Sequence, residues 1–288
     1  MNRLFCFGLG YCAEALAARL RPKGWRIAGT ARTRERVKAL AAHGYESFQF
    51  DGRLADFASA LKNATHVLIS APPTVEGDPV LARHVHDLSA LAPRPLWVGY
   101  LSTTGVYGDH QGAWVDETTP VAPASERAKR RVAAEHAWLA WGAAVGVPVH
   151  IFRLAGIYGH GQNQLVAVRE GTARRIVKPG QVFSRIHVDD IAAVLEASIE
   201  RPNAGAIYNV CDDEPAPPHE VIEYAAGLLK MPPPPLETFE EAARSMSEMA
   251  LSFYTESKRV KNGRIKTELG VRLAYPTYRE GLQALLPA

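Results

Sequence analysis

Short apolar runs alternate with longer amphipathic segments through the first half of the chain, and this alternation predicts strands separated by helices. The expected strands cover residues 4–7, 25–30, 47–50, 65–70, 96–101 and 147–152. The expected helices cover 12–20, 35–42, 57–61, 79–91 and 125–142. Connections of this length join parallel strands, and helices then cover both faces of the sheet. We therefore predict a doubly wound, parallel α/β sheet.

The alternation becomes irregular after Gly159. A strand is expected at 206–210, with helices at 189–200, 218–229, 240–250 and 278–286 and a proline-rich break at 232–235. Asp189 or Asp190 is the expected N-cap of the first of these helices. The pattern predicts a sheet domain of residues 1–154 plus about 183–210. A smaller C-terminal α/β lobe is expected from about 155–182 and 211–288.

Composition narrows the class of protein. The 288 residues include 33 Lys+Arg and 30 Asp+Glu, and a formal charge of +3 with 22% charged residues argues against disorder and against binding nucleic acid through charge. The three cysteines (Cys6, Cys12 and Cys211) lack the spacing of a disulfide framework or a zinc cluster. The sequence contains neither a signal-peptide pattern nor an apolar stretch that could span a membrane. We expect a cytoplasmic protein that binds no nucleic acid, membrane or metal.

A glycine motif follows the first expected strand and opens the first expected helix. It reads GxGxxA and comprises Gly8, Gly10, Tyr11, Cys12 and Ala13, with Leu9 between the glycines. The first glycine permits a tight turn, the second lets a pyrophosphate approach the backbone, and the alanine lets helix and strand pack closely. The N-terminus of the helix would attract the phosphates. This context predicts an NAD(P)-binding Rossmann fold, against the alternative of a turn that binds nothing.

The end of the second strand indicates which dinucleotide is bound. NAD-binding chains place an acid there, whereas this chain has Arg32, followed by Arg34 and Arg36 in the next helix. A guanidinium suits a 2′-phosphate, so we predict NADP, with NAD as the alternative. Two other segments are expected near the cofactor. Asp51 could accept from the adenine or cap a turn, and Ser70, Ala71 and Pro72 would let the fourth strand approach closely.

Ser102–Gly108 reads STTGVYG, which resembles the SSxxVYG segment of extended short-chain dehydrogenases, the NAD-dependent epimerase/dehydratase family. Four further segments are similar to that family in order and spacing: Pro120–Pro123, Arg153–Gly161, Ile186–Ile191 and Tyr208–Pro215. GxGxxA in place of GxxGxxG resembles the family's atypical branch of bacterial reductase-like proteins. The resemblance covers nearly the whole chain and implies a substrate site between the Rossmann domain and the C-terminal lobe.

The sequence departs from the family at the catalytic centre. The resemblance implies a YxxxK motif on the helix after Pro123, but Arg127 stands at the tyrosine position and Arg131 at the lysine position. Arg131 could still donate to the ribose, whereas Arg127 cannot exchange a proton near neutral pH. Thr103 aligns with the family's active-site Ser/Thr. Tyr107 is a substitute proton donor only if nearby arginines lower its pKa, and packing is the alternative role.

Two functions remain open at this point. The first is an NADP-dependent oxidoreductase or epimerase-type enzyme whose substrate is a small carbonyl or nucleotide-sugar-like compound, anionic if the arginine pair faces it. The second is a non-catalytic protein that binds NADP(H) as a sensor or regulator. The resemblance also raises a homodimer built on helix pairing, with an ordinary intramolecular helix as the alternative.

Overall fold

The computed structural model describes residues 2–50, 57–91 and 96–286. A parallel sheet of seven strands lies at its centre, in the order β11-β7-β5-β4-β1-β2-β3. Their bounds are β1 Arg3–Phe7, β2 Arg26–Ala31, β3 Glu46–Gln49, β4 His66–Ile69, β5 Trp97–Thr103, β7 Val149–Leu154 and β11 Ile207–Val210. The predicted doubly wound α/β fold is confirmed, and strand order reverses between β1 and β4, where such sheets bind ligands.

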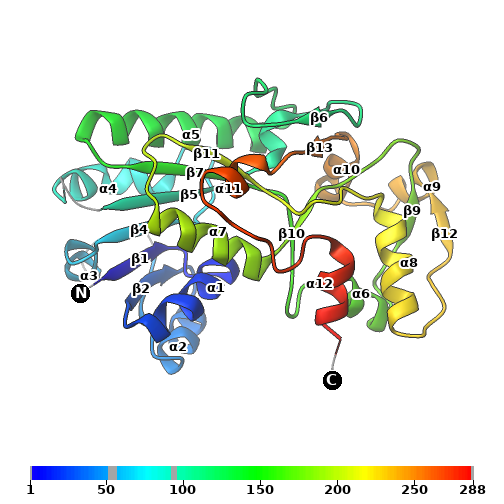
Figure 1. Cartoon of the computed structure of the whole chain (residues 1–288), viewed down its shortest axis with the longest axis horizontal. Helices are drawn as coiled ribbons and strands as arrows, with labels where there is room; N and C mark the ends of the chain where they lie inside the picture. The colour runs from blue at the N-terminus through cyan, green and yellow to red at the C-terminus, as the bar shows by residue number, and fades with distance from the viewer. Residues whose placement is uncertain (1, 51–56, 92–95, 287–288) are drawn as a thin grey trace.

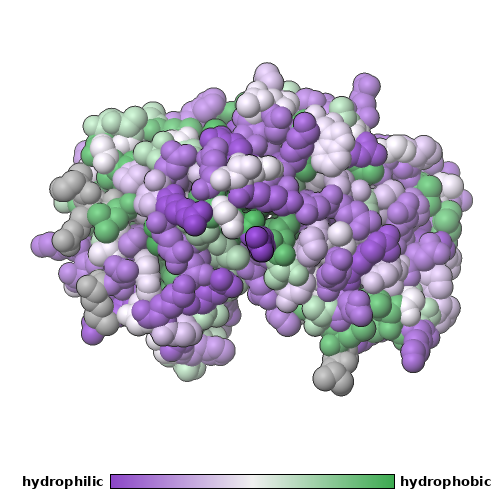
Figure 2. Space-filling view, viewed as in Figure 1, coloured by the Kyte–Doolittle hydropathy of each residue, from purple (hydrophilic) through white to green (hydrophobic). Residues whose placement is uncertain are grey.

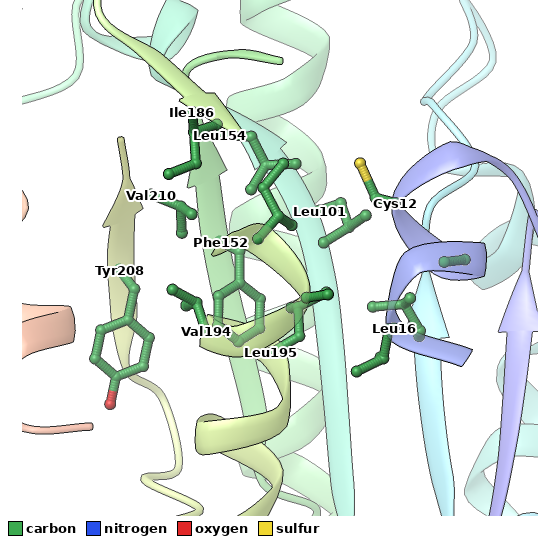
Figure 3. Packing of buried hydrophobic residues seen from close by; sticks show 14 of the residues in the cluster. Cys12, Leu16, Leu101, Phe152, Leu154, Ile186, Val194, Leu195, Tyr208 and Val210 are labelled. Carbon is green, nitrogen blue, oxygen red and sulfur yellow. The ribbon is translucent and has the colours of Figure 1, made fainter. Parts of the chain in front are cut away.

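Helices cover both faces of this sheet (Figure 1). Alternate strand residues point to opposite sides, so Leu4 and Cys6 of β1 belong to one buried cluster and Phe5 and Phe7 to another. The first cluster is closed by α1 (Tyr11–Leu20), α2 (Arg34–Ala42) and α7 (Val188–Glu200). Figure 3 shows Leu16 of α1 and Leu195 of α7 beside Leu101 and Phe152 of the sheet. The second cluster is closed by α3 (Ala58–Lys62), α4 (Pro79–Ser89) and α5 (Glu126–Val145).

The C-terminal lobe is built from short elements (Figure 1). Its strands pair in parallel: β8 (Gly156–Tyr158) with β10 (Arg185–His187), and β9 (Arg175–Val177) with β12 (Leu236–Thr238). Its helices are α6 (Gln164–Arg169), α8 (Pro218–Leu228), α9 (Phe239–Ala243), α10 (Glu248–Tyr254) and α12 (Tyr278–Ala284). Two small clusters, centred on Tyr158 and Tyr254, form its core. In the space-filling view a notch separates the lobe from the sheet domain along the lower edge (Figure 2).

The remaining short elements connect the two parts. β6 (Trp114–Val115) pairs with β13 (Arg259–Val260), and α11 (Gly263–Thr267) packs against β11. Two 3-10 helices, η1 (Arg21–Lys23) and η2 (Thr104–Tyr107), complete the described elements. Segments far apart in sequence are thereby tied to the carboxyl end of the sheet.

Two local predictions for the second half of the chain were wrong. The helix expected at 240–250 is two helices, because the chain leaves helical geometry after Ala243 and Ser247 caps α10 by accepting from Ala250 N–H. Neither aspartate caps α7. Instead, His187 Nδ1 accepts from Asp189 N–H at 3.2 Å, while the Asp190 carboxylate accepts from Ala274 and Tyr275 N–H. His187 is fully buried.

Candidate functional site

The glycine loop lies at the carboxyl end of β1, as the motif predicted. Gly8 has φ +92°, and its N–H donates to Thr30 Oγ1 at 3.0 Å. A Cβ at Gly8 would lie 3.2 Å from the Ala71 nitrogen. Both the left-handed backbone and the approach to β4 therefore require glycine here. Ser70 and Ala71 are tied to β1, since both of their N–H groups donate to the Phe7 carbonyl.

Gly10 leaves the start of α1 open. It is the N-cap residue in extended geometry, and no side chain caps the helix. A Cβ at Gly10 would meet nothing within 4 Å. Ala13, one turn along, is fully buried against the sheet. The first-turn N–H groups and the helix dipole thus face open space, which fits the pyrophosphate of a dinucleotide.

Tyr11 and Cys12 occupy different surroundings. The Tyr11 hydroxyl donates to the His160 carbonyl at 3.0 Å, which ties α1 to the loop after β8. Cys12 lines the large cavity described below. Burial raises the pKa of the Cys12 thiol to about 11, so this thiol stays protonated near neutral pH.

The arginines after β2 differ in their contacts. Arg36 forms an ion pair with Glu14, and Arg34 Nε donates to Gln49 Oε1 at 3.4 Å. The Arg32 side chain is exposed at the end of β2 and contacts no acceptor among the described residues. Of these arginines, Arg32 is therefore the one available to a cofactor phosphate. Asp51 lies outside the described residues.

A cavity of about 760 Å³ runs from the glycine loop into the C-terminal lobe. Cys12 and Ser70 line its cofactor end, and Thr103, Arg127 and Arg131 line its middle. Neither Ala71 nor Pro72 lines it. The structure therefore brings three of the four predicted catalytic residues to one cavity beside the predicted cofactor loop.

Thr103 and Arg131 present polar groups to this cavity. Thr103 ends β5, and its Oγ1 accepts from Gly105 N–H at 3.1 Å, so its own hydroxyl hydrogen remains available to donate. Arg131 donates through Nη1 to the Leu101 carbonyl at 2.7 Å and to the Tyr100 hydroxyl at 3.1 Å. These bonds orient the guanidinium at the end of β5.

Arg127 lies one turn before Arg131 on α5. It is exposed and forms no hydrogen bond or ion pair with any described residue. Neighbouring Lys129 instead pairs with Glu126 at 2.7 Å. Arg127 and Arg131 thus give the middle of the cavity positive charge that no carboxylate of the described residues neutralises at ion-pair distance.

The substitute donor, Tyr107, does not reach the cavity. Its side chain is fully buried, and its hydroxyl donates to Asn209 Oδ1 at 2.8 Å and accepts from Arg153 Nη1 at 3.0 Å. Desolvation raises the pKa of Tyr107, although nearby Arg153 opposes the shift. This is opposite to the change that catalysis would need. The catalytic prediction for Tyr107 was therefore wrong, because the residue packs within a buried polar network.

That network gives a first testable prediction. Replacing Tyr107 by phenylalanine should lower the free energy of unfolding by about 1–2 kcal/mol, because buried Asn209 and Arg153 each lose a partner. Dinucleotide binding should not change. Urea denaturation measures the stability of the variant, and ligand titration on the same preparation measures its dinucleotide affinity. A folded variant that has lost cofactor affinity would contradict the packing role.

The lobe end of the cavity was not anticipated from the sequence. Its side chains include Arg174, Phe183, Arg185, Tyr254 and Lys258. Arg174 pairs with Glu237, and Lys258 pairs with Glu256 at 2.6 Å. Arg185 is the signal that sequence reading could have used, since a cation between apolar neighbours in a short strand is unusual. The other residues come from segments that only the fold brings together.

Comparison with known proteins agrees with this geometry. The model of the "NAD dependent epimerase/dehydratase family" matches residues 88–211, which include Thr103, Arg127 and Arg131. Residues 88–211 therefore form a domain of the NAD-dependent epimerase/dehydratase family. The predicted resemblance and fold are therefore confirmed, and a family that depends on NAD(P) agrees with a dinucleotide site at the glycine loop.

Individual relatives span the whole chain. A functionally unknown conserved protein from Silicibacter pomeroyi is 53% identical, with a TM-score of 0.91 over 99% of this chain and 98% of its own. Protein YeeZ of Escherichia coli is 28% identical over 96% of this chain and 97% of its own. The dTDP-glucose 4,6-dehydratase of Bacillus anthracis, solved with NAD, is 19% identical with a TM-score of 0.77 over 99% and 95%. This last likeness concerns the fold alone.

The described residues contain neither a membrane-spanning helix nor a cluster of metal-binding side chains. No helix in residues 2–50, 57–91 and 96–286 is both long and apolar enough to cross a membrane. Across the same ranges, no three His, Cys, Asp or Glu side chains are grouped as a metal site would require.

Proposed function

We propose that this epimerase/dehydratase-family protein is an NADP-dependent oxidoreductase or epimerase-type enzyme for a small anionic carbonyl or nucleotide-sugar-like compound. The proposal rests on one continuous cavity. It extends from Cys12 and Ser70 beside the uncapped α1 to Thr103, Arg127 and Arg131. A substrate in the middle of this cavity would lie next to a dinucleotide held by the glycine loop.

Three parts of the cofactor would each have a contact in the chain. The Gly8–Ala13 loop would hold the pyrophosphate, Arg32 the 2′-phosphate and Arg131 the nicotinamide ribose. When bound, the dinucleotide supplies or accepts a hydride. These residues only bind and orient it.

Thr103 and Arg127 would act on the substrate. The Thr103 hydroxyl can donate to a carbonyl oxygen, because Gly105 N–H already occupies one of its lone pairs. Arg127 can stabilise negative charge that develops on that oxygen. It cannot deliver the proton, because a guanidinium is not deprotonated in proteins. Water entering the open cavity would then be the proton source.

The absence of an ionisable donor among the predicted residues favours a second candidate, a sensor that binds NADP(H) and regulates a partner without turnover. Thr103, Arg127 and Arg131 are the predicted catalytic residues that line the cavity, and none of them exchanges protons readily near neutral pH. We prefer the enzyme because the cavity extends well beyond the cofactor loop. Space of that kind is expected of a substrate site.

The preference for NADP is tested at Arg32. Arg32→Ala should weaken NADPH binding about 10- to 100-fold, the value of a charge-assisted phosphate contact, and leave NADH binding unchanged. Arg34→Ala is the matched control, because Arg34 already bonds Gln49. Isothermal titration calorimetry gives the affinities of the wild type and of both variants for NADPH and for NADH. Equal losses for NADPH and NADH would refute the phosphate contact.

Enzyme and sensor are separated by following NADPH absorbance with a panel of aldehydes, ketones and oxo acids. The enzyme should oxidise NADPH with at least one compound, and Arg127→Ala should slow anionic compounds more than neutral ones. A folded protein that binds NADPH and leaves it unchanged across the panel would rule out the oxidoreductase and favour the sensor, or an epimerase, which oxidises no NADPH overall.

A further inference from the structure

Arg185 is a buried cation at the lobe end of the cavity. It lies in β10, is 6% exposed and lines the cavity wall. Its Nη1 donates to the carbonyls of Phe183 at 2.8 Å and Ala216 at 3.1 Å. Its Nε and Nη2 donate to no acceptor among the described residues. One edge of the guanidinium is thus fixed by backbone, and the other edge is available.

No carboxylate of the described residues neutralises this cation at contact distance. Arg185 forms no ion pair with them, although Arg174, Arg175 and Lys258 around it each have one. The acid that acts on it most is Asp212, which is 1% exposed. Burial raises the pKa of Asp212 to about 8, so that carboxyl is largely neutral near pH 7. An uncompensated buried charge is costly, which favours an anionic ligand here.

The walls around Arg185 are aromatic and apolar. Phe183, Phe253 and Tyr254 line the same cavity, together with Pro218 and Ile222. The Phe183 and Tyr254 rings lie 5.6 Å apart at 75°, and the Arg185 guanidinium carbon is 6.0 Å from the Phe183 ring centre. Such rings favour a flat, apolar body next to the charged group.

We propose that this end of the cavity binds a carboxylate carried on an aromatic or conjugated body, with both carboxylate oxygens accepting from Nε and Nη2 of Arg185. This inference rests on the proposed function only in taking the cavity as the substrate site. A single guanidinium edge with two donors matches a carboxylate in geometry and in charge. A phosphate would bring a second negative charge next to apolar side chains, so it fits this site less well.

The test uses trans-cinnamate, its neutral isostere trans-cinnamamide, and phenyl phosphate. Calorimetry on the full chain, without dinucleotide and again with NADPH, should show cinnamate binding at least about 10-fold more tightly than cinnamamide. Arg185→Met should abolish that preference. Arg175→Met is the matched control, because Arg175 pairs with Glu223 and does not line the cavity. Phe183→Leu should weaken the binding of cinnamate and leave that of acetate, which has no ring, unaffected.

Equal binding of cinnamate and cinnamamide to the wild type would overturn the proposal, and this comparison needs no variant. Tighter binding of phenyl phosphate than of cinnamate would also overturn it. A preference for cinnamate over cinnamamide that survives in folded Arg185→Met would do the same. Carboxylate binding with no NADPH binding would refute the cofactor but not this site. NADPH binding without carboxylate preference would refute this site and leave the oxidoreductase proposal standing.

Discussion

Replacing Glu135 by alanine is expected to lower the free energy of unfolding by about 3–5 kcal/mol. Glu135 is 1% exposed and accepts from Arg153 Nη2 at 2.8 Å, from Arg153 Nε at 3.3 Å, and from the Ser102 hydroxyl. The substitution leaves the buried Arg153 guanidinium without its counter-charge. Urea denaturation followed by circular dichroism measures the change.

The matched control is Glu126→Ala on the same helix. Glu126 is exposed and pairs only with Lys129 among the described residues, so its loss should leave the denaturation midpoint where it is. A Glu135→Ala protein as stable as the control would contradict the view that this buried pair fixes α5 against β7. Arg131, one turn before Glu135, depends on that fixed position to reach the end of β5.

Gly10→Ala should reduce NADPH affinity about 100-fold, equivalent to about 2.7 kcal/mol, while the protein remains folded. The structure itself has room for the added methyl group, since nothing lies within 4 Å of it, and the backbone is extended. The space that it would fill is the approach of the pyrophosphate to the helix terminus. Calorimetric titration gives the affinity, and thermal unfolding should show a cost of at most about 1 kcal/mol.

Gly227→Ala is the control for this experiment. Gly227 lies in α8 of the lobe, and a methyl group added there would also meet nothing within 4 Å, but no cofactor is expected at this helix. The NADPH affinity of this variant should match that of the wild type. Unchanged affinity in Gly10→Ala would mean that the dinucleotide does not approach the backbone at this glycine.

The sheet domain was predictable because its signals are local. A run such as Leu4–Phe7 ends at Gly8, and a helix with small residues follows, so both periodicity and turn chemistry indicate the same βαβ unit. Thr103 and the arginine pair were identified through the resemblance to the family, and the spacing of four residues placed the two arginines on one face of the helix. These features bring residues together through elements that are regular in sequence.

The lobe end of the cavity could not be predicted in the same way. Arg185, Phe183 and Tyr254 meet through short strands and helices whose pairing is set by long-range contacts. The role of Tyr107 depended on a partner far along the chain, Asn209, whose side chain takes up its hydroxyl. Sequence spacing contains no information on such a contact.

The most direct test of the account is a fluorescence titration of the wild-type protein with NADPH and, separately, NADH. The chain's five tryptophans provide the donor for energy transfer to a bound nicotinamide. We predict saturable transfer with both, with NADPH bound more tightly. Tighter NADH binding would overturn the role of Arg32 and retain the Rossmann site. Saturation by neither would contradict the central claim that the Gly8–Ala13 loop holds a dinucleotide.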